Sequence, residues 1–142
     1  MEDRLEQAKM ALRDEITFAA VLSDGSLVTS ERKGIAPMMA LLAEDAGCLQ
    51  GAAVADRVIG RAAALLMAKG GVAELYGEII SSHARKAFQE TGLSFSYGKE
   101  VAYIINRSHT GMCPMEETVL RISDPEEAYL ALVQKQRELA GR

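Results

Sequence analysis

The sequence predicts an α/β domain built on a largely parallel sheet. Two consecutive segments, residues 51–71 and 72–92, each combine a β-type run, a tight turn and a helix that stops at glycine. Because the connections are short and strands alternate with helices, we expect parallel strands joined by right-handed crossovers. A chain of 142 residues is the size of one domain with a substantial core, so we treat residues 1–142 as a single domain.

The N-terminal part is predicted to place a helix and a hairpin before these units. Apolar residues recur at helical spacing within a leading helix over residues 2–14. The β-type runs 16–22 and 27–30 flank a Ser-Asp-Gly-Ser turn and predict a hairpin. A short helix over residues 38–43 and a loop over 44–50 are expected to follow.

The C-terminal part is predicted to contain two more strands and two helices. The β-type runs 93–97 and 101–105 lie on either side of Gly98. Pro114 suits the first position of a short helix, and a closing helix is expected over residues 124–140, after a serine–aspartate start signal.

The polar residues of the first strand–helix unit are expected at the carboxyl end of its strand, where α/β sheets bind ligands. We expect the strand over residues 52–55, with Asp56 as the N-cap of the helix. Gly60 in the first helical turn costs stability relative to alanine, so another element or a ligand is expected to approach the backbone there. Arg57 and Arg61 are four residues apart and are expected to share one helix face.

Composition excludes several classes of protein. A net charge of −4 without a basic stripe argues against binding to a nucleic-acid duplex. The apolar run at residues 62–68 is too short for a membrane span, and the charged N-terminus is unlike a secretory signal. The two cysteines, Cys48 and Cys113, lack metal-ligand spacing. We expect a cytoplasmic protein without a metal or other cofactor, and its uncovered strand edges leave a homo-oligomer open.

Three segments, ADRVIGRAAALL, GEIISSHA and YIINRSHTGMCPMEE, resemble a bacterial family known only as a domain of unknown function, within the cytidine-deaminase-like superfamily. The resemblance spans about residues 16–132 and implies a three-layer α/β/α sandwich with a mixed sheet of about five strands. Zinc deaminases carry [HC]-x-E and P-C-x-x-C segments at two helix starts. Residues 55–57 and 80–83 stand at the corresponding places and lack these ligands, so the resemblance does not extend to the zinc-dependent reaction.

Several polar residues at predicted strand ends and helix starts have both a structural and a functional interpretation. Ser81 and Ser82 are suited to cap a helix, and less suited to act as nucleophiles. Cys113 is either a small buried residue or a thiol activated by a helix N-terminus. Glu116 is either a capping carboxylate or a general base.

Our leading hypothesis is a protein that binds a small anionic or nucleotide-like ligand. One alternative is a zinc-independent enzyme that uses Cys113 as nucleophile, or Asp56 and Glu116 for proton transfer. Another is a structural or interaction module in which the same residues form caps and ion pairs. The candidate catalytic residues are Cys113, Asp56 and Glu116. The candidate ligand-binding residues are Arg57, Arg61, Ser81, Ser82, Asn106 and Arg107.

Overall fold

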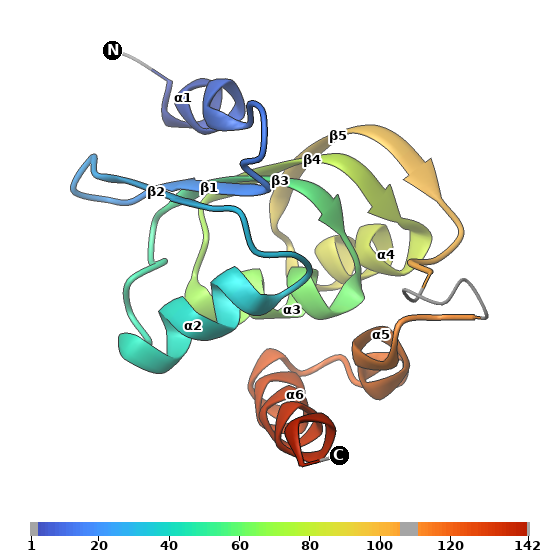
Figure 1. Cartoon of the computed structure of the whole chain (residues 1–142). Helices are drawn as coiled ribbons and strands as arrows, with labels where there is room; N and C mark the ends of the chain where they lie inside the picture. Colours follow the sequence, from blue (N-terminus) through green and yellow to red (C-terminus); the bar gives the residue numbers. More distant parts are fainter. Residues whose placement is uncertain (1–2, 106–110, 142) are drawn as a thin grey trace.

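The computed structural model describes residues 3–105 and 111–141 and contains a five-stranded sheet of order β2-β1-β3-β4-β5 (Figure 1). The strands are β1 Phe18–Val21, β2 Leu27–Ser30, β3 Ala53–Ile59, β4 Glu74–Ser81 and β5 Ser94–Val101. β1 is antiparallel to both of its neighbours, whereas β3, β4 and β5 are mutually parallel. It follows that β2 points the same way as β3, and four strands end at one edge, which we call the carboxyl edge. The predicted mixed sheet is confirmed.

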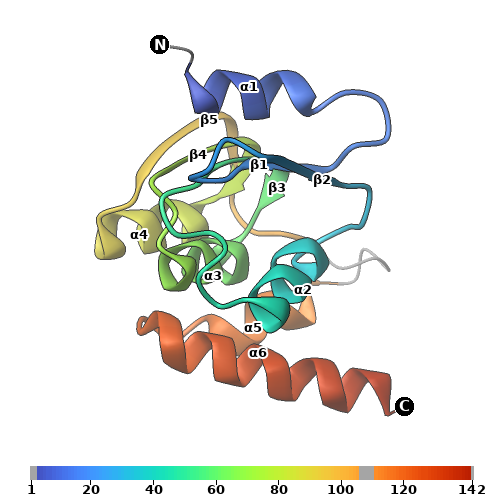
Figure 2. The same cartoon turned by 90° about the vertical axis from the view of Figure 1, so that its left-hand side faces the viewer.

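The helices form a layer on each face of the sheet (Figures 1 and 2). α1 (Arg4–Ala11) packs alone on one face, against β1 and β3. α2 (Ala36–Glu44), α3 (Arg61–Gly70) and α4 (Ser82–Thr91) cover the other face. α5 (Pro114–Val119) and α6 (Pro125–Ala140) pack on the outside of α3. This is the predicted three-layer arrangement, with α5 and α6 added beyond one helical layer.

The main hydrophobic core lies between the sheet and the layer of α2, α3 and α4. α3 is buried on almost every side because it contacts the sheet, α2 and α4 as well as α5 and α6, which explains its lack of a polar face. A smaller cluster lies under α1, where Ala8 and Leu12 pack on Ala19, Val21 and Ala55. Both faces of β1 are therefore covered, and all four of its residues are buried.

The first strand of the central unit is longer than the sequence predicts. β3 continues to Ile59, so Asp56 lies within the strand, and its expected role as the N-cap of α3 is wrong. Asp56 pairs with Phe18 of β1 and Gly77 of β4. Strand pairing on both sides outweighs the preference of aspartate for a turn. The N-cap of α3 is Gly60, which has an extended backbone.

Only one strand, β5, forms around Gly98, and it passes through that glycine. A Cβ atom at position 98 would lie 2.8 Å from the carbonyl oxygen of Glu78 on β4, so the glycine permits close approach of two strands and does not mark a break. Ile105 forms only an isolated bridge with Met112. The expected strand at 101–105 is therefore wrong.

The predicted helix ends are largely confirmed. Ser81 caps α4, which stops at Gly92 with a φ of 76°. Asp124 caps α6 through the backbone N–H of Glu127, and α5 begins at Pro114. Within residues 3–105 and 111–141, no helix is long and apolar enough to cross a membrane.

Candidate functional site

The carboxyl edge of the sheet has a step beside Asp56. Phe18, the first residue of β1, pairs with Asp56 on one side and with Ser30, the last residue of β2, on the other. β3 and β4 continue beyond this level to Ile59 and Ser81. Asp56 therefore lies where β1 and β2 stop on one side, while β3, β4 and β5 project further on the other. Asn106 and Arg107 fall outside the described residues.

The N-terminus of α3 is occupied by a carboxylate from α5. Glu116 accepts hydrogen bonds from the backbone N–H groups of Arg61, at 2.6 Å, and Ala62, at 2.8 Å. The positive end of the helix dipole favours a carboxylate at this position. Burial raises the pKa of Glu116, while the two backbone hydrogen bonds act in the opposite direction. Glu116 thus supplies the side-chain cap that Gly60 lacks.

Position 60 requires glycine because the side chain of Glu116 lies against its backbone. A Cβ atom at position 60 would come within 2.3 Å of Glu116 Oε1, far inside any real contact. The close approach that the sequence predicts at Gly60 is therefore made by another element of the chain. The anion that sits at the N-terminus of α3 is the protein's own carboxylate.

Arg61 is a buried arginine that joins three elements. Its side chain is 5% exposed and pairs with Glu90 at 3.1 Å. The guanidinium also donates to the carbonyl oxygens of Val119, at 3.0 Å, and Ile122, at 2.6 Å. The bond from Arg61 lowers the pKa of Glu90. Arg61 thereby fixes the connection between α5 and α6 onto α3 and α4.

Arg57 serves a different part of the molecule. Its Nε donates to the carbonyl oxygen of Ile16 at 2.8 Å, and Nη1 lies 3.1 Å from a carboxylate oxygen of Glu78. These bonds tie the connection between α1 and β1 to β4. The expectation that Arg57 and Arg61 share a helix face is wrong, because Arg57 belongs to β3 and only Arg61 to the helix.

The two serines after β4 bind neighbouring protein groups. Ser81 is buried, and its hydroxyl accepts the backbone N–H of Ala84 at 3.0 Å. Ser82 donates to a carboxylate oxygen of Glu100 at 2.7 Å, which lowers the pKa of that carboxyl. Arg85 donates to both carboxylate oxygens of Glu100 at 3.0 Å. This network joins the start of α4 to the end of β5.

Cys113 is half-buried and precedes the first residue of α5. Its backbone N–H donates to the carbonyl oxygen of Ile104 at 3.0 Å, and its own carbonyl accepts from Glu117 at 3.0 Å. Nucleophilic use of the thiol stays a prediction. Across residues 3–105 and 111–141, no three histidine, cysteine or acidic side chains are grouped so as to hold a metal ion.

Asp56 differs from the other candidates. It is 5% exposed, and its Oδ2 atom has no hydrogen-bond partner among the described residues. Burial raises its pKa well above the ordinary value of 3.8, with the backbone near Val58 and Arg57 acting in the opposite direction. Burial therefore shifts this carboxyl towards its protonated form, which carries one O–H donor beside a carbonyl acceptor.

Comparison with known proteins places this arrangement in a family. A family model described as a domain of unknown function, DUF1893 (TM1506), matches residues 7–136. The chain belongs to the DUF1893 family. It is similar to the crystal structure of a DUF1893 family protein (TM1506) from Thermotoga maritima, with 28% identity, a TM-score of 0.82, and coverage of 95% of this chain and 92% of that chain. No curated protein matches the chain.

The predicted membership of a family of unknown function is thus confirmed. These matches do not test its place in the cytidine-deaminase-like superfamily, which stays a prediction. In this DUF1893 domain the signature residues ADRVIGRAAALL and CPMEE meet in space, because Glu116 of the second segment caps the helix that begins at Arg61 of the first.

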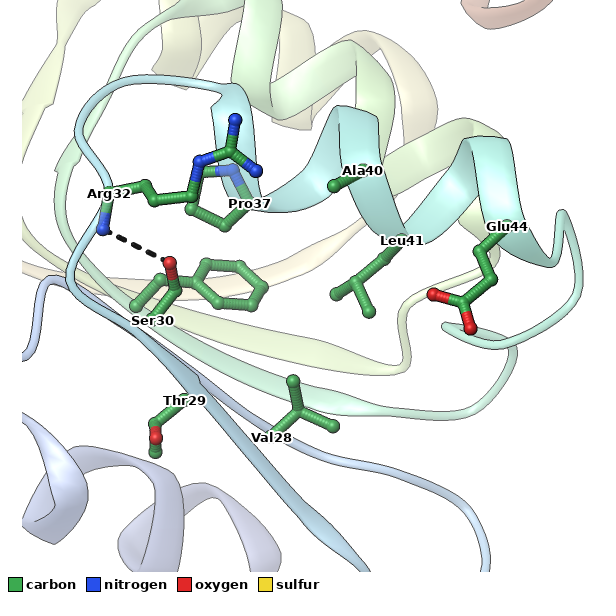
Figure 3. A pocket seen from close by; sticks show the side chains of 9 residues that line it. Val28, Thr29, Ser30, Arg32, Pro37, Ala40, Leu41 and Glu44 are labelled. Atoms are coloured by element: carbon green, nitrogen blue, oxygen red, sulfur yellow. Dashed lines mark hydrogen bonds between the residues drawn. The ribbon is translucent and has the colours of Figure 1, made fainter.

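Sequence reasoning missed one concave feature of this DUF1893 domain. A groove of about 160 Å³ separates β2 from α2 (Figure 3). One available signal was the spacing of Pro37, Ala40, Leu41 and Glu44, which puts these residues on one face of a helix. The groove is lined by Phe18, Val28, Thr29, Ser30, Arg32, Pro37, Ala40, Leu41 and Glu44.

Proposed function

We propose that this domain binds a small molecule at the step in the carboxyl edge of the sheet, and that the carboxyl group of Asp56 contacts it. The observation that supports this is the buried Oδ2 atom without a partner in the described part of the chain. Leaving a buried polar atom unpaired costs about 1–3 kcal/mol, and such an atom calls for an explanation such as a functional role, an ordered water or strain.

The remaining described candidates point away from an anionic ligand. Glu116 fills the N-terminus of α3, and Arg57 and Arg61 are bound to carboxylates and backbone carbonyls. Without a free cation among these residues, an anion near Asp56 would meet only another acid. The sequence suggests either a small anionic ligand or a nucleotide-like one, and the nucleotide-like ligand is therefore better supported. In this proposal Asp56 contacts the base of the ligand and not its phosphate.

The chemistry of Asp56 narrows the ligand further. A protonated carboxyl offers a donor and an acceptor side by side. The complementary group is planar and has an adjacent acceptor and donor, as on the hydrogen-bonding edge of a pyrimidine base or another cyclic amide or amidine. Because Asp56 is 5% exposed, binding requires local adjustment around it, and we expect association slower than a diffusion-controlled encounter.

Two substitutions at position 56 test this proposal. Asp56→Asn keeps a donor and an acceptor on the same planar frame, whereas Asp56→Leu removes both. We expect thermal shifts with cytosine, uracil, cytidine or uridine to be retained in Asp56→Asn and lost in Asp56→Leu. Equal shifts in both variants, or no shift of the unsubstituted protein with any of these compounds, would refute the proposal.

A further inference from the structure

The groove between β2 and α2 has a mainly apolar lining and lies beside an open strand edge. Val28, Thr29 and Ser30 form one wall, and Pro37, Ala40 and Leu41 form the other (Figure 3). β2 is the last strand on its side of the sheet. The groove therefore lies where another extended chain can add to the sheet.

The pairing of β1 with β2 shows which backbone groups face outwards. The backbone N–H of Leu22 donates to the carbonyl oxygen of Ser26 at 2.8 Å, which makes these two residues a hydrogen-bonded pair. Pairs alternate in an antiparallel ladder, so Val28 and Ser30 also direct their backbone groups towards β1. The N–H and C=O groups of Thr29 then point to the free edge, where they are available to an added strand.

Charges of opposite sign stand at the two ends of the groove. Arg32 lies beside the start of α2, and Glu44 lies at its last residue (Figure 3). The dipole of α2 adds to this polarity, positive at the Arg32 end and negative at the Glu44 end. None of the ion pairs within the described residues involves Arg32 or Glu44.

The length of the groove matches a short strand. From Pro37 to Glu44 the helix rises by about 10 Å, at 1.5 Å per residue. An extended chain covers that distance in about three residues, and every second side chain points to the same side. A five-residue segment can therefore place its central side chain on the floor and its two outer side chains at the charged ends.

We propose that this groove binds an extended segment of another protein, which adds to β2 as a further strand. The segment has the pattern acidic–x–apolar–x–basic. Its apolar side chain enters the groove, its main chain pairs with Thr29, and its acidic and basic side chains meet Arg32 and Glu44. This is recognition by strand addition, in which main-chain hydrogen bonds give affinity and alternate side chains give selectivity.

Capped synthetic peptides and amide-resolved NMR titration test this proposal. The probe is acetyl-Glu-Thr-Leu-Thr-Lys-amide, and the comparison peptide carries lysine at both ends. We expect the probe to shift the amide signals of Thr29 and Leu41, with the comparison peptide about three- to tenfold weaker, the range typical of charge pairs at an interface rim. If neither peptide shifts those signals, the proposal fails.

Three variants separate the parts of the proposal. Arg32→Glu makes both ends acidic, and we expect it to reverse the preference towards the peptide with two lysines. Ala40→Tyr fills the groove and is expected to abolish binding, whereas Ala43→Tyr, on the same helix but outside the groove, is the matched control and should bind normally. Unchanged preference in Arg32→Glu, or equal binding by the two tyrosine variants, would overturn it.

A second copy of this chain is the competing occupant of the β2 edge. Sedimentation velocity is expected to show no self-association that depends on this edge. If the protein is instead a dimer in which the Thr29 amide is protected from hydrogen exchange and the peptide does not compete, the edge belongs to the dimer and the peptide proposal is wrong. Loss of pyrimidine binding at Asp56 leaves this outcome unaffected, because the two sites use different residues.

Discussion

The carboxylate of Glu116 occupies the space where a side chain on Gly60 would begin. The separation would be 2.3 Å from a Cβ atom to Oε1, and the same carboxylate caps α3 through the N–H groups of Arg61 and Ala62. Gly60 and Glu116 are far apart in the chain and form one structural unit. Their role in stability can be measured separately from any ligand.

We expect Gly60→Ala and Glu116→Ala each to destabilise the fold, and the two losses not to add. Glu116→Ala leaves two buried N–H groups without a partner, at a cost of about 2–4 kcal/mol. Gly60→Ala displaces the same carboxylate, so most of its cost should vanish when Glu116 is already alanine. Denaturant unfolding of the single and double variants measures the coupling. Gly47→Ala, whose Cβ would meet only Asp45 at an ordinary 3.6 Å, is the control; strict additivity would contradict this account.

Arg61→Lys is expected to destabilise the domain by about 2–3 kcal/mol although it keeps the charge. The guanidinium reaches Glu90 and the carbonyl oxygens of Val119 and Ile122 together, and a lysine amine cannot match that planar set of donors. Arg85→Lys, at a half-exposed pair with Glu100, should cost much less. Chemical denaturation measures the free energy of unfolding of both variants. Equal losses would show that Arg61 contributes no more to stability than a residue in an ordinary surface ion pair.

Arg57→Ala is expected to loosen the connection between α1 and β1 without affecting ligand binding. The variant removes the bonds to the carbonyl oxygens of Asp14 and Ile16 and to Glu78. Hydrogen exchange should accelerate in residues 12–17 and remain slow in β4. Loss of a pyrimidine-induced thermal shift in this variant would return Arg57 to the list of ligand-binding residues.

Asp56→Asn is expected to stabilise the protein, and more so as the pH rises. Burial raises the pKa of Asp56 in the folded state above its ordinary 3.8. At a pH between these two pKa values, the folded state keeps a proton that the unfolded chain has released. The contribution of Asp56 to the free energy of unfolding is fully present below about pH 4 and is lost as the pH rises through the folded pKa. Thermal unfolding at pH 4 and pH 8 should show little difference at pH 4 and a gain of about 3–10 °C at pH 8. A gain that is larger at pH 4 would contradict the assigned direction.

The alternation of strands and helices was predictable because it depends on local sequence patterns. The hairpin turn, the Ser81 and Asp124 caps and the helix stop at Gly92 each depend on a few adjacent residues. Gly98 and Gly60 show the limit. The sequence predicts a close neighbour at Gly60 and a break between two strands at Gly98, but the residues that approach them, Glu116 and Glu78, come from other elements and leave no local signal.

The candidate site was predictable in composition and not in role. Asp56, Arg57 and Arg61 lie close together in the sequence, yet their environments differ. Asp56 is a buried carboxyl with one unpaired oxygen, Arg57 binds the α1–β1 connection, and Arg61 binds the α5–α6 connection. Burial and strand pairing decide among these roles, and both depend on contacts with distant segments. For the same reason the groove beside β2 was missed, since it requires that strand and helix α2 to be placed together.

The most direct test of the account is a carbon-13 NMR titration of the Asp56 side-chain carboxyl, with and without cytidine. We predict a pKa well above 3.8 in the free protein and a change in the carboxyl signal on adding cytidine or a related pyrimidine. A pKa at or below 3.8, together with a signal that no pyrimidine alters, would contradict the claim that Asp56 is held neutral to meet a ligand.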